Sequence, residues 1–219
     1  MVAFFEWPVT RAGATRHIAD APAQARRQQA FPSSGAGEQS REDNPDIRKG
    51  WNTTASASPS FIAALHSDRP AADRTEKMGL YGWLIGRWEM DAVIRDDDGR
   101  KHTGRGEIHF GWVLEGRAIQ DVWILPGFFY GTTLRVYDPG IDAWHIFWSD
   151  PLKQRYRRQI GRAQGNDIVQ EGKDDTGAAV RWRFIEITAD SFHWLGARSP
   201  DGGANWQLQA EYFARRVNS

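Results

Sequence analysis

The 219-residue sequence contains no cysteine. This absence excludes disulfide bonds, thiolate metal sites and cysteine nucleophiles. The chain also lacks any apolar run that approaches the roughly 20 residues of a membrane-spanning helix. Its apolar residues 2–5 are too few for the apolar region of a signal peptide, and no basic residue precedes them. We therefore expect a soluble cytoplasmic protein without a membrane partner.

An excess of charge of one sign is lacking too. The 28 Lys and Arg residues balance the 28 Asp and Glu residues, so no bulk positive field draws the chain to nucleic acid. One basic stretch, KQRYRRQIGR at 153–162, could form a nucleic-acid platform. Its charged side chains could equally protect an edge strand from pairing. Because the net charge is zero, we favour the edge strand and expect no nucleic-acid partner.

The signatures of several enzyme and cofactor classes are missing. The chain has no Gly-x-Ser-x-Gly elbow and no phosphate-binding loop, and GRGEIH at 104–109 lacks the third glycine of a dinucleotide motif. His102 and His109 are an odd number of residues apart, so they face opposite sides of one strand. By alternation, His109, His145 and His193 lie opposite the tryptophans, which argues against an axial haem ligand. We expect no metal and no cofactor.

Residues 1–58 differ from the rest of the chain. They are rich in Ala, Arg, Gln, Ser, Gly and Pro, and show no sustained helical or strand period. Such a composition cannot bury enough apolar area to offset the entropy of the chain. We expect a disordered tail, or non-native sequence added by an upstream start codon. A regulatory or targeting role is the alternative, and 59–219 is the expected folded domain.

What the chain has in abundance is aromatic residues: 11 Trp, 11 Phe and 5 Tyr. Aromatic side chains favour strands. A short helix capped by Ser60 is expected at 60–65, and a second helical turn at 76–85. Turn signals then arrive every eight to fifteen residues. The ten predicted strands are 88–95, 102–113, 117–125, 130–137, 143–149, 154–161, 167–172, 179–188, 191–198 and 205–215.

Alternation within these strands predicts a single apolar interior. Large apolar side chains repeat every second residue, with polar side chains between them. The inward rows are Ile108, Phe110 and Trp112; Trp144, Ile146 and Trp148; Val180, Trp182 and Phe184; Phe192 and Trp194; and Trp206, Leu208, Ala210 and Tyr212. No long helix intervenes, which leaves an antiparallel sandwich or barrel. We predict an all-β, up-and-down barrel of about 8–10 strands.

Four segments resemble an uncharacterised bacterial lipocalin-like family, a domain of unknown function, over about residues 76–216. They are LIGRW at 84–88, VLEGRA at 113–118, F-x-x-IT-x-DSF-x-W at 184–194 and S-x-DGG-x-x-W at 199–206. The Gly-x-Trp within the first segment is similar to the opening of lipocalins and other calycin barrels. The resemblance implies a calycin-like antiparallel barrel with an internal ligand pocket, and it implies no chemistry.

The last segment, SPDGGANW at 199–206, also resembles the Asp box of sialidase propellers. Asp boxes recur once per blade, and the best second candidate, DPGIDAW at 138–144, has the wrong spacing. We therefore interpret the octet as a hairpin turn in which Asp201 binds backbone amides.

The expected function is binding of a small hydrophobic or aromatic molecule inside the barrel. The residues that we expect to contact it are Trp88, Trp112, Trp123, Trp144, Trp148, Trp182 and Trp194. The alternative for these rings is that they simply fill the barrel, because a filled core and a pocket look the same in sequence.

A cofactor-independent cyclase, isomerase or hydrolase is the rival function. Asp121 lies between Ile119 and Trp123 on an apolar row, where burial would raise the pKa of a carboxyl group that acts as acid or base. Arg135 is its expected catalytic partner. Two alternatives stay open: Asp121 faces outward, or it forms a structural ion pair with Arg135 or Arg117.

Three phenylalanines point to a homodimer if they are exposed and clustered: Phe128, Phe129 and Phe147.

Overall fold

The computed structural model describes residues 59–96 and 98–218. The segment that we expect to be disordered or non-native, 1–58, lies outside the described residues. None of the helices in the described part of the chain is long and apolar enough to cross a membrane. The elements are α1 (Phe61–Leu65), β1 (His66–Ser67), a 3-10 turn (Ala72–Arg74), α2 (Thr75–Gly82), β2 (Gly86–Arg95), β3 (Lys101–Val113), β4 (Ala118–Leu125), β5 (Phe129–Asp138), β6 (Ala143–Asp150), β7 (Arg155–Gln164), β8 (Asp167–Lys173), β9 (Ala179–Ile185), β10 (Ser191–Ser199) and β11 (Gln207–Arg216).

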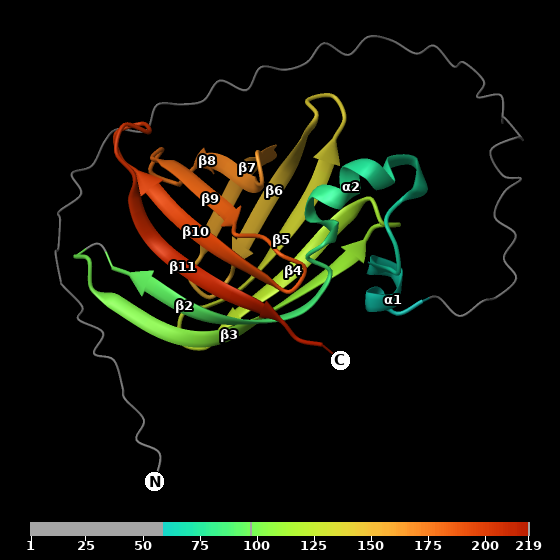
Figure 1. The fold of residues 1–219 in the computed structure, drawn as a ribbon, viewed down its shortest axis with the longest axis horizontal. Helices are drawn as coiled ribbons and strands as arrows, with labels where there is room; N and C mark the ends of the chain where they lie inside the picture. Colours follow the sequence, from blue (N-terminus) through green and yellow to red (C-terminus); the bar gives the residue numbers. More distant parts are fainter. Residues whose placement is uncertain (1–58, 97, 219) are drawn as a thin grey trace, which may run out of the picture. The chain divides into compact units, whose positions relative to one another are not determined.

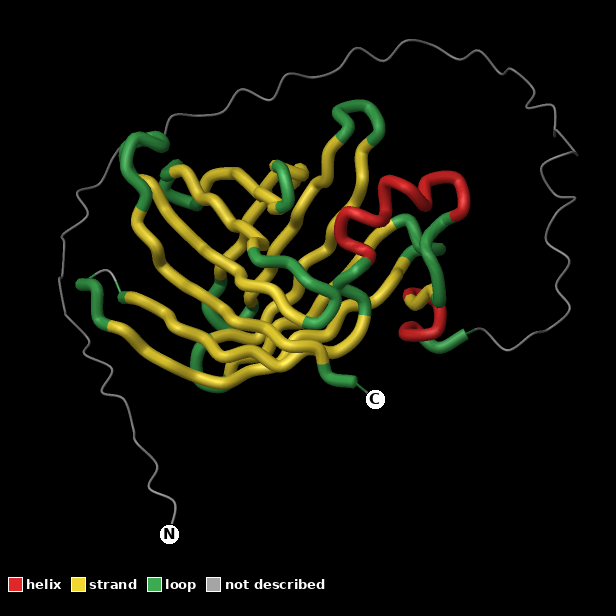
Figure 2. Tube along the Cα trace, viewed as in Figure 1, coloured by secondary structure: helices red, strands yellow, loops and turns green. Residues whose placement is uncertain are grey.

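Ten antiparallel strands, β2 to β11, form a closed up-and-down barrel (Figures 1 and 2). Each strand pairs with the next along the chain, and β11 returns to pair with β2. The predicted fold class and the ten predicted strands are confirmed. The basic segment 153–162 is not an edge strand, because β7 pairs with both β6 and β8.

Both predicted helices are present, and the second ends earlier than expected. The Ser60 hydroxyl accepts a hydrogen bond from the Ala63 N–H at 3.3 Å, as an N-cap does. After α2, the chain makes a turn of the 3-10 type, in which the Leu84 N–H donates to the Tyr81 carbonyl three residues earlier at 3.0 Å. Gly86 then opens β2 with a φ of 122°, which only glycine adopts readily.

The two ends of the barrel differ. Helix α2 lies at one end, away from the β2–β3 and β10–β11 connections in Figure 1. Lys77 of α2 pairs with Asp142 of the β5–β6 turn at 2.8 Å, and the buried Met78, Tyr81 and Leu84 are fully enclosed. We call this the helix-capped end. The opposite end carries the β2–β3, β4–β5, β6–β7, β8–β9 and β10–β11 turns, and we call it the open end.

The predicted alternation holds in most strands but changes face near the start of β11. Gly196 pairs with Ala210 whereas Ala197 pairs with Leu208, so Gln209 is an extra residue, a β-bulge. Ala210 and Tyr212 are buried as predicted. The prediction that Leu208 and Trp206 also point inward is wrong, because the bulge turns that part of the strand over. The Trp206 ring instead lies 4.0 Å from the Arg181 guanidinium on the outside of the barrel.

The SPDGGANW segment forms the β10–β11 turn. Asp201 Oδ1 accepts hydrogen bonds from the Asn205 N–H at 2.9 Å and from the Ser199 hydroxyl at 2.6 Å. The Ser199 hydroxyl also accepts from the Gly203 N–H at 2.8 Å, and Gly202 and Gly203 have φ angles of 76° and 108°. These bonds are local to the turn, so the octet is a hairpin, as its isolation in the sequence predicts.

Replacing Asp201 with alanine should lower the melting temperature by about 2–4 °C. The bond from the Asn205 N–H, then that from Ser199, holds the pKa of Asp201 well below its usual range. This stabilisation is present above the unfolded-state pKa of 3.8 and is lost as the pH falls through the lower folded-state pKa. Thermal unfolding followed by circular dichroism at pH 7 and below pH 3.8 should show the difference shrinking in acid. An unchanged melting temperature at pH 7 would contradict this assignment.

Candidate functional site

Six inward aromatic residues form a continuous ring of contacts between the middle of the barrel and its open end. Each ring centroid lies 4.7–6.1 Å from those of its neighbours around the circuit. Trp194 and Tyr212 stack at 4.7 Å with an interplanar angle of 11°. We name this set the aromatic belt. Its members are Trp123 of β4, Phe129 of β5, Trp148 of β6, Trp182 of β9, Trp194 of β10 and Tyr212 of β11.

Glycines on the facing positions make room for two of the belt indoles. A Cβ atom at Gly196 would lie 2.6 Å from Cη2 of Trp194, closer than two carbon atoms can approach. Gly131 lies under the Trp148 ring in the same way. These positions explain glycine inside strands, where it otherwise weakens the structure. The belt rings can therefore lie flat across neighbouring strands.

The seven tryptophans of the sequence prediction separate into two groups. Trp88, Trp112 and Trp144 are buried toward the helix-capped end, and the Trp88 indole N–H donates to the Leu84 carbonyl at 2.7 Å. The other four belong to the belt, where the side chains near the open end remain partly exposed. The partly exposed tryptophans are Trp148 and Trp182. Solvent therefore reaches the inner face at the open end.

A buried ion pair lies deeper in the barrel. Asp121 and Arg135 both point inward and form an ion pair with side-chain exposures of 0% and 2%. Asp121 also accepts a hydrogen bond from the Thr133 N–H at 2.6 Å. Of the alternatives left open for Asp121, the outward orientation is excluded and the pair with Arg135 is present. The catalytic role predicted for the two residues stays a prediction, and this geometry gives the carboxylate a fixed cationic partner.

Aromatic rings surround the Arg135 guanidinium on the helix-capped side. It lies 5.4 Å from the Tyr81 ring centroid and 5.5 Å from that of Phe110. Gln170 donates to the Tyr81 hydroxyl at 2.9 Å, and Gln159 donates to the Gln170 carbonyl at 3.1 Å. Burial raises the pKa of Tyr81 to about 12 although the Arg135 charge opposes it. The interior thus contains one enclosed layer of hydrogen-bonded polar groups.

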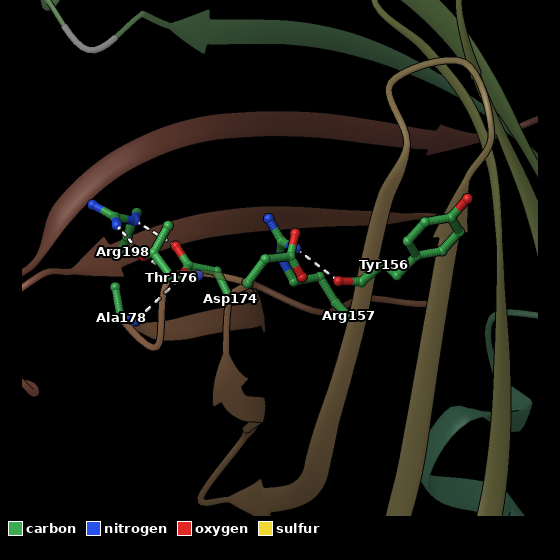
Figure 3. A network of polar contacts seen from close by, with 7 residues as sticks. Tyr156, Arg157, Asp174, Thr176, Ala178 and Arg198 are labelled. Carbon is green, nitrogen blue, oxygen red and sulfur yellow. Dashed lines mark hydrogen bonds and ion pairs between the residues drawn. The ribbon is translucent and has the colours of Figure 1, made fainter. Parts of the chain in front are cut away.

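At the open end, two inward arginines hold the β8–β9 turn. Arg198 binds Asp174 Oδ2 at 2.6 Å and the Thr176 hydroxyl at 2.9 Å, and Arg157 binds Asp175 at 3.0 Å. Figure 3 shows Arg198 and Arg157 reaching this turn from different sides. Burial alone would raise the pKa of Asp174, but the bonds from Arg198 and Thr176 outweigh it and hold the pKa well below its usual range.

The histidines lie away from the belt or at its edge. His109 lies 3.2 Å from Glu107, His145 lies 2.9 Å from Asp138, and His193 stacks on Phe213, all on the outer face. His102 is on the inner face at the open end, where its Nε2 lies 2.7 Å from Asp96. Within residues 59–96 and 98–218, no three His, Asp or Glu side chains are grouped so that they could hold a metal ion.

The sequence prediction missed several inward residues at the open end. Phe129 was considered for an exposed patch with Phe128 and Phe147, but it contacts Trp148 inside the barrel, and Phe128 is also packed against the core. Only Phe147 of the three is largely exposed, so these residues do not form one patch and the homodimer stays a prediction. The arginines of β7 were considered only as part of a basic segment. Extending the alternation back from the buried Gly161 would have placed Arg157 inside.

Two hollows on the surface lie outside the barrel interior. One covers β7 to β9 on the outer face, and the other lies beside β1. In the first, Arg181 pairs with Glu171 at 2.7 Å and Arg183 pairs with Asp167. Two of its three arginines are therefore neutralised within the strands, and we take the belt as the candidate site.

No protein-family model matches the chain, and no curated protein matches it. The resemblance to a lipocalin-like family therefore stays a prediction. Among solved structures, the S-type phycobiliprotein lyase CPES from Guillardia theta is 12% identical with a TM-score of 0.48, covering 68% of this chain and 99% of that one. Rv2717c from M. tuberculosis is 13% identical with a TM-score of 0.44, covering 65% of this chain and 98% of that one.

Breaking the buried ion pair should destabilise the barrel more than removing both of its members. Asp121→Leu or Arg135→Met alone leaves one charge buried without a partner and should lower the free energy of unfolding by about 3–5 kcal/mol. The double variant should recover part of that loss. Urea unfolding measures all three, with Arg87→Met as a control because the Arg87–Glu107 pair is exposed. A double variant as unstable as the sum of the singles would contradict a structural pair.

Proposed function

We propose that the barrel binds a small apolar or aromatic molecule that enters at the open end and contacts the aromatic belt. The observation that supports this most directly is the partial exposure of Trp148 and Trp182 on the inner face. Indoles that only filled a core would be buried, as Trp88 and Trp144 are at the other end. The calycin-like arrangement that the sequence resembles is consistent with the same function.

The belt offers such a ligand a large apolar contact surface and rings that face different directions. Aromatic rings interact best edge-to-face or offset, and each buried ring contributes a large apolar area. Trp148 and Trp182 meet edge-on at an interplanar angle of 86°, so their surfaces face different directions. A flat ligand could contact the face of one indole and the edge of the other. The ion pair of Asp121 and Arg135 lies in the enclosed layer beneath.

The rival enzymatic function receives less support from this arrangement. An acid or base must exchange its proton with a substrate, which requires contact with it. Asp121 is 1% exposed, and its oxygens already interact with Arg135 and the Thr133 N–H. We therefore place the ligand at the belt and assign Asp121 a structural role. Like the binding function, the cytoplasmic location belongs to this proposal.

The binding proposal predicts that the neutral probe N-phenyl-1-naphthylamine binds saturably at the belt. Its emission should rise on binding, and Trp182→Leu should weaken the affinity about five- to tenfold because a large ring surface is lost. Trp206→Leu is the matched control, since this indole packs on Arg181 outside the barrel. Fluorescence titration at fixed ionic strength measures both. Absence of saturable binding, or equal weakening by the two variants, would refute the proposal.

A further inference from the structure

The aromatic belt has a gap at β7 and β8, and the side chains in that gap are polar. None of the belt rings comes from these two strands, whose inward positions at this depth are Gln159, Gln170 and Gly172. A Cβ atom at Gly172 would lie 2.9 Å from Cγ of Gln159, so this glutamine lies close over the backbone of β8. Gln170 is the register partner of Trp182, a member of the belt. The gap thus places two amide groups next to the belt.

The Gln159 amide has an oxygen atom without a hydrogen-bond partner. Its Nε2 donates to the backbone carbonyl of Gln170 at 3.1 Å. Because a carbonyl group can only accept, this bond determines which end of the amide is the nitrogen and which is the oxygen. Oε1 of Gln159 finds no donor among the described residues, although the residue is only 1% exposed. A buried acceptor in this state lowers the stability of the fold unless a donor reaches it.

Gln170 on the paired strand is in the same condition. Its Nε2 donates to the Tyr81 hydroxyl at 2.9 Å, and its Oε1 has no partner within the part of the chain that the structure describes. The residue has no exposure to solvent. Buried polar groups in proteins are normally satisfied by the protein, by ordered water or by a ligand. Two unsatisfied acceptors on neighbouring strands therefore mark a place for a donor that the described chain does not supply.

The charges around these acceptors favour a neutral donor. The charged groups of the enclosed layer are Asp121 and Arg135, which pair with each other, and Arg157 nearer the open end pairs with Asp175. A cationic group placed in this layer would have no carboxylate of its own to compensate for its lost hydration. An anionic group would meet the amide oxygen of Gln159, which accepts and cannot donate. A neutral N–H or O–H group fits both conditions.

From this arrangement we infer that the ligand is an apolar or aromatic molecule with a neutral hydrogen-bond donor, such as a ring N–H or a hydroxyl, which Gln159 accepts at the inner edge of the belt. The inference rests on the proposed function and adds the chemical class of the ligand to it. Trp182 is partly exposed and is paired with Gln170, so the donor enters beside this ring. The apolar body of the ligand stays on the belt. A ligand without a donor would leave the acceptor unsatisfied and would bind less tightly.

A matched pair of probes tests the inference: indole, which has a ring N–H, and benzofuran, which has an oxygen atom in its place. Isothermal titration calorimetry at pH 7 should show indole binding about fivefold more tightly. Gln159→Met keeps the length of the side chain but removes the amide. It should abolish that preference and leave the affinity for benzofuran unchanged, and Gln159→Leu is a second variant with the same expectation. Gln164→Leu is the control, because this glutamine is exposed at the end of the same strand.

The outcomes separate the two proposals. Equal affinities for indole and benzofuran in the wild-type protein would overturn the donor subsite and leave the binding function standing. That result is expected if a water molecule instead joins Oε1 of Gln159 to Nε of Arg135, which also lacks a partner among the described residues. A preference for indole that survives in both Gln159 variants, or that is lost equally in Gln164→Leu, would also overturn the subsite. Binding of neither compound would overturn both proposals. Circular dichroism spectra that match the wild type would confirm that each variant is folded.

Discussion

Close contact between large aromatic rings and glycine determines how this barrel is filled. Ten strands enclose the interior, and two of its indoles lie so close to the backbone that a side chain beneath them would clash. Gly131 lies beneath the Trp148 ring, Gly196 lies beneath the ring of Trp194 on its own strand, and Gly161 lies beneath the Tyr81 hydroxyl of α2. The glycines thus decide where each ring lies. The position of the belt rings and that of Tyr81 in α2 depend on these close contacts.

The interior is therefore layered along its axis. At the helix-capped end, Phe184 packs against Tyr81 of α2 and Trp88 packs against Trp83 just after the helix, both without exposure to solvent. The ion pair of Asp121 and Arg135 follows, then the belt, and then the arginines and carboxylates of the open end. Apolar surface becomes progressively more accessible in that direction. A molecule that approaches from solvent meets charge first and aromatic surface second.

Sequence patterns predicted the strands and much of the interior, because turn residues and a period of two are local properties. They did not predict that Trp206 lies on the outer face, because the extra residue Gln209 reverses the alternation. The local sequence contains no signal for this β-bulge. They could not distinguish a filled barrel from an open one. That difference depends on where α2 packs, which is set by buried contacts such as that of Tyr81 with Gln170, 89 residues away. The position of Phe129 stayed open for the same reason, because its exposure depends on Trp148 of the neighbouring strand.

The separation of the two ends places the side chains at the entrance away from those that hold the helix. Substitutions at distant sites that share no contacts have effects on folding that simply add. Trp182 at the open end contacts Trp148 and Trp194. Helix α2 is instead held through Tyr81, which contacts Phe184 and Gln170. Side chains at the entrance can therefore change in the course of evolution while the packing of the helix against the barrel stays as it is.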